Sequence, residues 1–137
     1  MSAEVADVLN EQIRCAEAML HALSREHQAL VAGDTDLLTS VGNDKARLVE
    51  NLEALEIERR RIAPADDAQN RGSPQWQALL ALISTCKDQN QRNGALVKAR
   101  SEQVQIALQA LRGSEPGFYD PSGYKPSARS ARPLGTA

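Results

Sequence analysis

The spacing of the apolar side chains is the feature that most constrains this chain. They recur at alternating intervals of three and four residues in three successive segments, a pattern typical of α-helices that pack side by side. Aromatic residues make up 3% of the chain and hydrophobic residues 42%, and a helical core can be filled with Leu, Val, Ile and Ala alone. The sequence therefore predicts an all-α fold, an elongated antiparallel three-helix coiled-coil bundle.

The first two helices are expected at residues 2–32 and 35–62. Gly33 supplies a stop for the first, and Asp34 or Thr35 can accept hydrogen bonds from the free N–H groups of the second. Because only one or two residues join them, the two helices should form an antiparallel hairpin. The apolar seam of the first helix is expected to consist of Leu9, Ile13, Ala16, Leu20, Leu23, His27 and Leu30.

The third helix is expected at residues 74–112, after a loop at 63–73. Ser73 is a good N-cap before Pro74, and Gly113 ends the helix. At 1.5 Å per residue this helix is roughly 60 Å long, against roughly 45 Å for each of the others. We therefore expect residues 104–112 to extend past the other helices and to carry apolar side chains that the chain does not cover.

Residues 1–113 are thus predicted to form the bundle and residues 114–137 a flexible C-terminal tail. The tail is rich in Gly, Pro, Ser and Arg and holds an aromatic cluster of Phe118, Tyr119 and Tyr124. Trp76, at the start of the third helix, is expected to close the open end of the bundle.

Charge and hydropathy exclude several kinds of partner. A formal net charge of -2 gives no general attraction to nucleic acid or to anionic lipid. No window is long and apolar enough for a membrane span, and the acidic N-terminus, with Glu4 and Asp7, lacks the pattern of a signal peptide. We expect a cytoplasmic protein without direct lipid binding.

The sequence offers no constellation for catalysis, so we expect a protein that is not an enzyme and has no metal or cofactor. His21 and His27 are out of phase with each other on the helix, and the two cysteines have no Cys or His neighbour at metal-ligand spacing. Cys15 and Cys86 are interpreted as thiols, although a disulfide is geometrically possible if the first and third helices are parallel.

Five polar residues occupy seam positions where a simple coiled coil would have Leu. Two interpretations are open: they fix register and orientation, as a buried Asn does in coiled coils, or they line a groove that a partner strand or helix enters. The five are Lys45, Arg59, Asn90, Asn93 and Arg100.

Four local features together resemble the FlgN family of flagellar export chaperones, and the resemblance spans essentially the whole chain. They are the Gly33-Asp34 turn, the Lys45-x-x-Leu48 segment, the Asn90-x-x-Asn93 step in a long last helix, and the segment Tyr119-Asp-Pro-Ser-Gly123. The resemblance implies a cytoplasmic chaperone that binds the C-terminal helical segments of the two hook-filament junction proteins before their export through the flagellar type III apparatus.

In that family the third helix supplies the substrate surface, and a tail tyrosine engages the cytoplasmic domain of the membrane-embedded export gate. The tyrosine that matches best is Tyr119, beside Asp120 and Gly123, with Tyr124 as the second choice. Two other functions stay open, a self-assembling structural coiled coil or weak homo-oligomer, and a regulatory adaptor that acts through its tail. The substrate surface maps onto Asn93, Val97, Arg100, Val104, Leu108 and Leu111.

Overall fold

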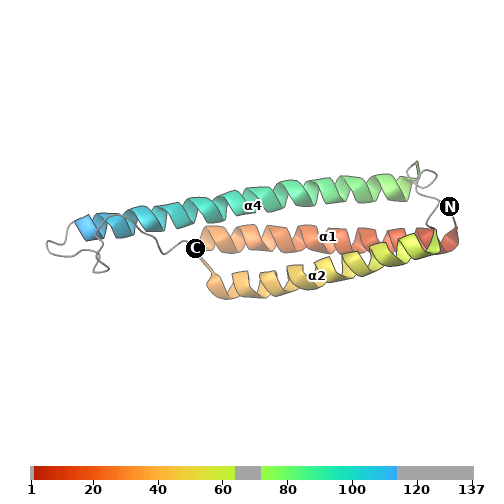
Figure 1. Ribbon diagram of the computed structural model, residues 1–137, viewed down its shortest axis with the longest axis horizontal. Helices are drawn as coiled ribbons and strands as arrows, with labels where there is room; N and C mark the ends of the chain where they lie inside the picture. The colour runs from red at the N-terminus through yellow and green to blue at the C-terminus, as the bar shows by residue number, and fades with distance from the viewer. Residues whose placement is uncertain (1, 64–71, 114–137) are drawn as a thin grey trace. The chain divides into compact units, whose positions relative to one another are not determined.

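The computed structural model describes residues 2–63 and 72–113. They form three helices, α1 (Ala3–Ala32), α2 (Thr35–Ile62) and α4 (Pro74–Gly113) (Figure 1). The prediction of an all-α fold with three helices, the last one longest, is confirmed. The division into a bundle and a tail from residue 114 lies outside the described residues and stays a prediction.

The turn between α1 and α2 is fixed by two adjacent residues. Gly33 has φ 71°, in the left-handed region where a residue with a Cβ atom is strained. The N–H of Asp34 donates to the carbonyl of Ala29 at 2.9 Å, and its carboxylate accepts from the N–H of Leu37 at 3.0 Å. One helix is thus ended and the next begun within two residues, which turns the chain back on itself.

Cross-helix contacts give the directions of the helices in the first part of the chain. Arg25 of α1 pairs with Asp44 of α2 at 3.1 Å, whereas Gln12, earlier in α1, bonds to Glu56, later in α2. The helices α1 and α2 are therefore antiparallel.

The first half of α4 runs parallel to α1. It begins at a cap in which Ser73 Oγ accepts from the N–H of Trp76 at 3.1 Å. Further along, Cys86 Sγ donates to the carbonyl of Ala16 at 3.5 Å, and contacts of Asn93 with α1 follow later in both helices. The two cysteines are free thiols, as interpreted from the sequence, and burial raises the pKa of each.

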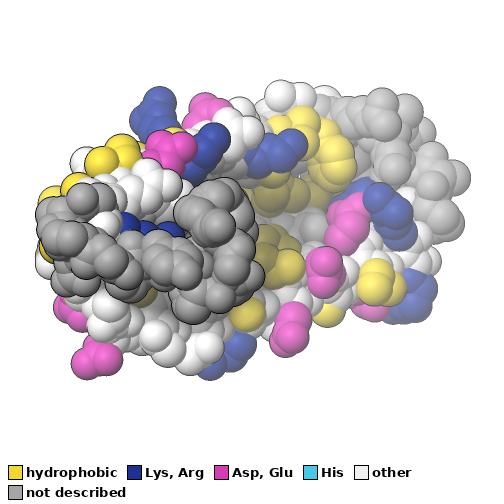
Figure 2. All heavy atoms as spheres, turned by 60° about the vertical axis from the view of Figure 1, so that its left-hand side comes forward, with side chains coloured by type: hydrophobic (Ala, Val, Ile, Leu, Met, Phe, Trp, Pro, Cys, Tyr) yellow, Lys and Arg dark blue, Asp and Glu magenta, His cyan; other side chains and the backbone are white. Residues whose placement is uncertain are grey.

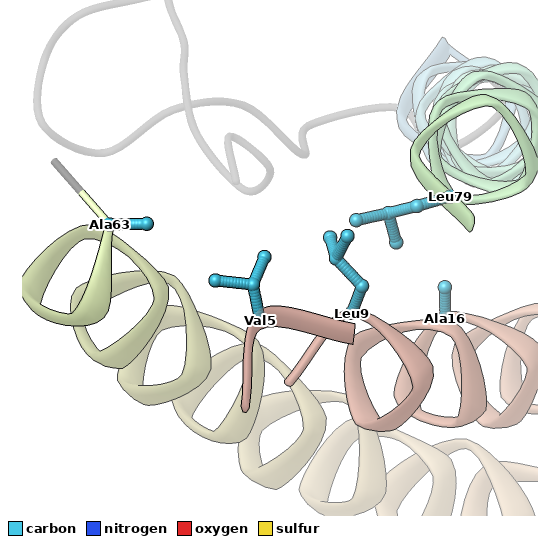
Figure 3. Packing of buried hydrophobic residues seen from close by; sticks show 5 residues of the cluster. All are labelled: Val5, Leu9, Ala16, Ala63 and Leu79. Atoms are coloured by element: carbon cyan, nitrogen blue, oxygen red, sulfur yellow. The ribbon is translucent and has the colours of Figure 1, made fainter. Parts of the chain in front are cut away.

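A core cluster lies where the three elements meet (Figure 3). Val5, Leu9 and Ala16 of α1 contribute to it together with Ala63, at the end of α2, and Leu79 of α4. Leu79 points toward Leu9, and Ala63 and Val5 point toward each other. Burying such side chains stabilises the fold by about 1.5–3 kcal/mol for each large aliphatic residue.

Trp76 packs against the same cluster, as expected of a residue that closes one end of the core. The guanidinium of Arg59 lies over its indole ring, 4.9 Å from the centroid. This arrangement lets an aromatic ring cover apolar residues on one side and hold a cation on the other.

The predicted seam of α1 is wrong at His27, whereas Ile13 packs against the core cluster as expected. Leu9, Ala16, Leu23 and Leu30 are buried as predicted, but His27 is exposed and does not lie in the core. Two polar residues of α1, Gln12 and Glu26, also face the other helices, because their side chains find partners there.

Candidate protein-binding surface

Among the described residues of α4, Asn93 is the last that is buried, and several apolar residues after it are exposed. Leu79 is 6% exposed and Asn93 2%, whereas Val97, Val104 and Leu111 are 51%, 58% and 62% exposed. The chain also divides into two units at this point, between Gly94 and Ala95. The second half of α4 therefore keeps the apolar spacing of a packed helix while Val97, Val104 and Leu111 face solvent.

A cluster of hydrogen-bonded side chains lies at the last buried position of α4. Asn93 Nδ2 donates to the carbonyl of Leu23 and to Glu26 Oε1, both at 2.9 Å. Lys45 of α2 donates to Glu26 at 3.0 Å and to Asn90 Oδ1 at 3.0 Å. We call Glu26, Lys45, Asn90 and Asn93 the polar cluster, and it joins all three helices within the first unit.

A second charged group lies near the core cluster. Arg59 is 2% exposed, and its guanidinium donates to Glu56 at 2.7 Å. This hydrogen bond is the main reason that the pKa of Glu56 falls from 4.5 to about 2, and hydrogen bonds from Gln12 and Arg60 lower it further. Arg59 is thus a buried cation held by a carboxylate that stays ionised down to low pH.

The five polar seam residues therefore differ in their surroundings. Asn93 and Arg59 are buried and bonded, and Lys45 is half-buried in an ion pair. Asn90 and Arg100 are exposed. For the three covered residues the contacts are those of side chains that set the register of neighbouring helices.

Four apolar side chains share one side of the second half of α4. At about 100° per residue they fall within an arc of about 60° around the helix axis. Val97, Val104 and Leu111 are exposed and Leu108 is half-buried. We call these four residues the α4 stripe.

Apolar surface of this kind is a common mark of a protein-binding site. In the space-filling view, hydrophobic side chains gather in patches on the face shown, among Lys, Arg, Asp and Glu side chains (Figure 2). A helix with a continuous exposed stripe suits a partner that lays its own amphipathic helix alongside.

The residues proposed from the sequence for substrate binding do not share one environment. Val97, Arg100, Val104 and Leu111 are exposed together on α4, with Leu108 beside them. Asn93 is buried in the polar cluster. The residues proposed for the export gate, Tyr119, Asp120, Gly123 and Tyr124, lie outside the described residues.

Sequence reasoning missed Glu26, which accepts hydrogen bonds from both Lys45 and Asn93. A signal was available, because counting outward from the Gly33-Asp34 turn of an antiparallel hairpin brings residue 26 opposite residue 41, one helical turn from Lys45. A Glu and a Lys at such positions are an ion-pair candidate.

Within the part of the chain that the structure describes, no helix is long and apolar enough to cross a membrane. The same residues contain no group of three or more His, Cys, Asp or Glu side chains that could hold a metal ion.

The family model and the curated relatives that match this chain carry the same name, FlgN. Residues 1–129 match the family model described as FlgN protein. The chain is 27% identical over 123 residues to the flagella synthesis protein FlgN of Salmonella typhimurium and equally to that of Salmonella typhi, covering 87% of this chain and 88% of each relative. No solved structure matches the chain.

Proposed function

Because the chain belongs to the FlgN family, whose curated relatives are flagella synthesis proteins, we propose that it is a cytoplasmic flagellar export chaperone. Its substrates are the C-terminal helical segments of the hook-filament junction proteins, which it binds through the α4 stripe. It then hands them to the export gate through Tyr119, Asp120, Gly123 and Tyr124 in the tail. Family membership supports a chaperone in flagella synthesis in general terms, and the substrates, the gate and the residues are the proposal.

The observation that carries the proposal is the exposure of the apolar residues Val97, Val104 and Leu111 in the part of α4 that follows the buried Asn93. Burying the four stripe residues against a partner helix is worth at most roughly 6–12 kcal/mol before association costs of several kcal/mol. With an association cost of about 4 kcal/mol, at most about 8 kcal/mol remains, an affinity of about 1 μM or weaker, which suits a chaperone that must hold a substrate and later release it.

Asn93 takes a positioning role in this proposal. Its side-chain amide is already bonded to Leu23 and Glu26, so it fixes α4 against α1 just before the exposed stripe begins. Val97, Arg100, Val104, Leu108 and Leu111 supply the contact surface.

Titration calorimetry of the full chain with a peptide from the C-terminus of a hook-filament junction protein tests the proposal. We expect 1:1 binding with a negative heat-capacity change, because apolar surface is buried. The double variant Leu108→Asp/Leu111→Asp should bind at least about 100-fold more weakly, since two charges would be desolvated at the interface.

The matched control introduces the same two charges at exposed apolar residues of α2. Val49 and Ile57 are 44% and 70% exposed, so Val49→Asp/Ile57→Asp should fold and bind the peptide within about threefold of the parent chain. Equal weakening by both double variants, or none by the α4 variant, would refute the placement of the site.

The gate contact has its own test. Tyr119→Ala should weaken binding of the full chain to the cytoplasmic domain of the export gate while leaving the junction-protein peptide unaffected. If gate binding is unchanged in both Tyr119→Ala and Tyr124→Ala, the tail is not the contact.

A further inference from the structure

The charged residues of the second half of α4 are not distributed evenly around the helix. Taking the middle of the α4 stripe as reference, Arg100 lies about 50° to one side, and Arg112 and Lys98 lie about 70° and 110° to the other. The acidic residue of this segment, Glu102, lies about 150° away, on the opposite side of the helix. All four side chains are exposed. The apolar stripe is therefore bordered by cations along both edges.

The sign of this border is opposite to that of the rest of the bundle. Residues 95–113 contain three basic residues and one acidic residue, a net charge of +2. Residues 1–94 contain ten basic and fifteen acidic residues, a net charge of -5. A basic, apolar surface on a chain with a net charge of -2 selects its partners by charge as well as by shape.

We propose that the α4 stripe takes an amphipathic helix whose apolar face is bordered by Asp and Glu residues. The inference rests on the proposed function and deepens it, because it names the chemical class of the bound segment. In paired helices the residues that flank the apolar seam meet across the interface, and opposite charges there favour pairing and speed association.

The same border acts against two other occupants. A helix edged with Lys or Arg would place like charges against Lys98, Arg100 and Arg112, which disfavours binding. A second copy of this chain would bring its own basic border to the same interface. An acidic partner helix is the occupant that the charges favour.

Two synthetic amphipathic peptides provide the test. They share one Leu seam and differ only at the edge positions, which carry Glu in one peptide and Lys in the other. Against the full chain at about 50 mM salt, fluorescence anisotropy should show the Glu peptide binding at least about tenfold more tightly. The preference should shrink as salt is raised to about 0.5 M, because screening weakens exposed charge pairs.

Two triple variants locate the effect. Lys98→Gln/Arg100→Gln/Arg112→Gln should reduce the preference to less than about threefold, because the charges next to the peptide are gone. Arg14→Gln/Arg47→Gln/Lys87→Gln removes three exposed cations from residues 1–94 and should leave most of the preference in place.

The outcomes separate this inference from the proposed function. Equal binding of the two peptides, a preference for the Lys peptide, or binding of neither overturns the acidic partner. If the junction-protein peptide still binds and Leu108→Asp/Leu111→Asp still weakens it, the docking site stands without the charge selection. Sedimentation that shows the chain pairing with itself through the stripe, blocked by the same double variant, also overturns the inference.

Discussion

The two halves of α4 carry the same apolar spacing and use it differently. In the first half, Leu79 is covered by α1 and Asn93 is bonded to it. In the second half, Val97 and Val104 continue the apolar spacing and are more than half exposed. A heptad pattern thus says that a helix has one apolar side, but not whether that side is covered by its own chain or by another.

Polar residues of α4 also differ in burial between its first and second halves. Asn93 is buried because an acceptor from α1 lies within hydrogen-bond distance, whereas Arg100, one heptad step later, is exposed. The covered half of α4 is therefore held by specific bonds as well as by apolar contact. This difference between the halves can be tested by changing matched residues in each.

The largest expected difference comes from the same substitution at two leucines. Leu9 is 0% exposed and Leu111 is 62% exposed. Leu9→Ala should lower the free energy of unfolding by about 2–5 kcal/mol, because it leaves a cavity in the core cluster. Leu111→Ala should change it by less than about 0.5 kcal/mol. Urea unfolding followed by circular dichroism measures both, and similar losses would mean that the second half of α4 is packed as tightly as the first.

The next comparison concerns two asparagines of the polar cluster. Asn93→Ala should lower the free energy of unfolding by about 1–3 kcal/mol, because the buried partners on Leu23 and Glu26 lose their donor. Asn90 is exposed and bonds to Lys45, so Asn90→Ala should cost less than about 1 kcal/mol. If Asn90→Ala is the more destabilising of the two, the polar cluster does not hold α4 in the way described.

Much of the fold could be predicted from the sequence because its determinants are local. The α1–α2 turn needs a glycine that tolerates positive φ and an aspartate that caps the next helix, and Gly33 and Asp34 provide both. Ser73 before Pro74 marks the start of α4 in the same way.

The features of the fold that could not be predicted from the sequence depend on contacts between residues far apart in the chain. The heptad spacing placed His27 on the seam of α1, where it is exposed. Gln12 and Glu26 face the other helices because Glu56, Lys45 and Asn93 satisfy them. The helix lengths predicted that the end of α4 is uncovered. They could not show where the exposure begins, because the apolar spacing continues unchanged past Asn93, which is buried.

The Arg59–Glu56 pair should make the stability of the covered part of the molecule depend on pH. Because the pKa of Glu56 is about 2 in the folded chain and 4.5 without its partners, its ionised form stabilises the fold above about pH 4.5. That contribution is lost as the pH falls from about 4.5 toward 2.

Comparing the chain with Glu56→Gln isolates this contribution from the other carboxylates. The difference in the free energy of unfolding, from urea titrations at several pH values, should be largest above pH 4.5 and should shrink below it. Glu58→Gln, which removes the exposed partner of Arg61, should show a much weaker dependence. A difference for Glu56→Gln that is constant with pH would contradict the lowered pKa.

The smallest expected effect concerns the glycine at the boundary between the two units. A Cβ atom at Gly94 would meet nothing within 4 Å, and the same holds for Gly42 in α2. Replacing either glycine by alanine should therefore favour the helix by about 0.5–1 kcal/mol.

The second half of α4 has little tertiary burial, so its helicity depends on propensity and on continuation from the packed half. Gly94→Ala should accordingly slow amide hydrogen exchange across residues 95–113 by about twofold to fivefold, and Gly42→Ala should leave those amides unchanged. Equal slowing by the two variants would show that the exposed half opens only together with the bundle, and the two halves of α4 would then be a single cooperative unit.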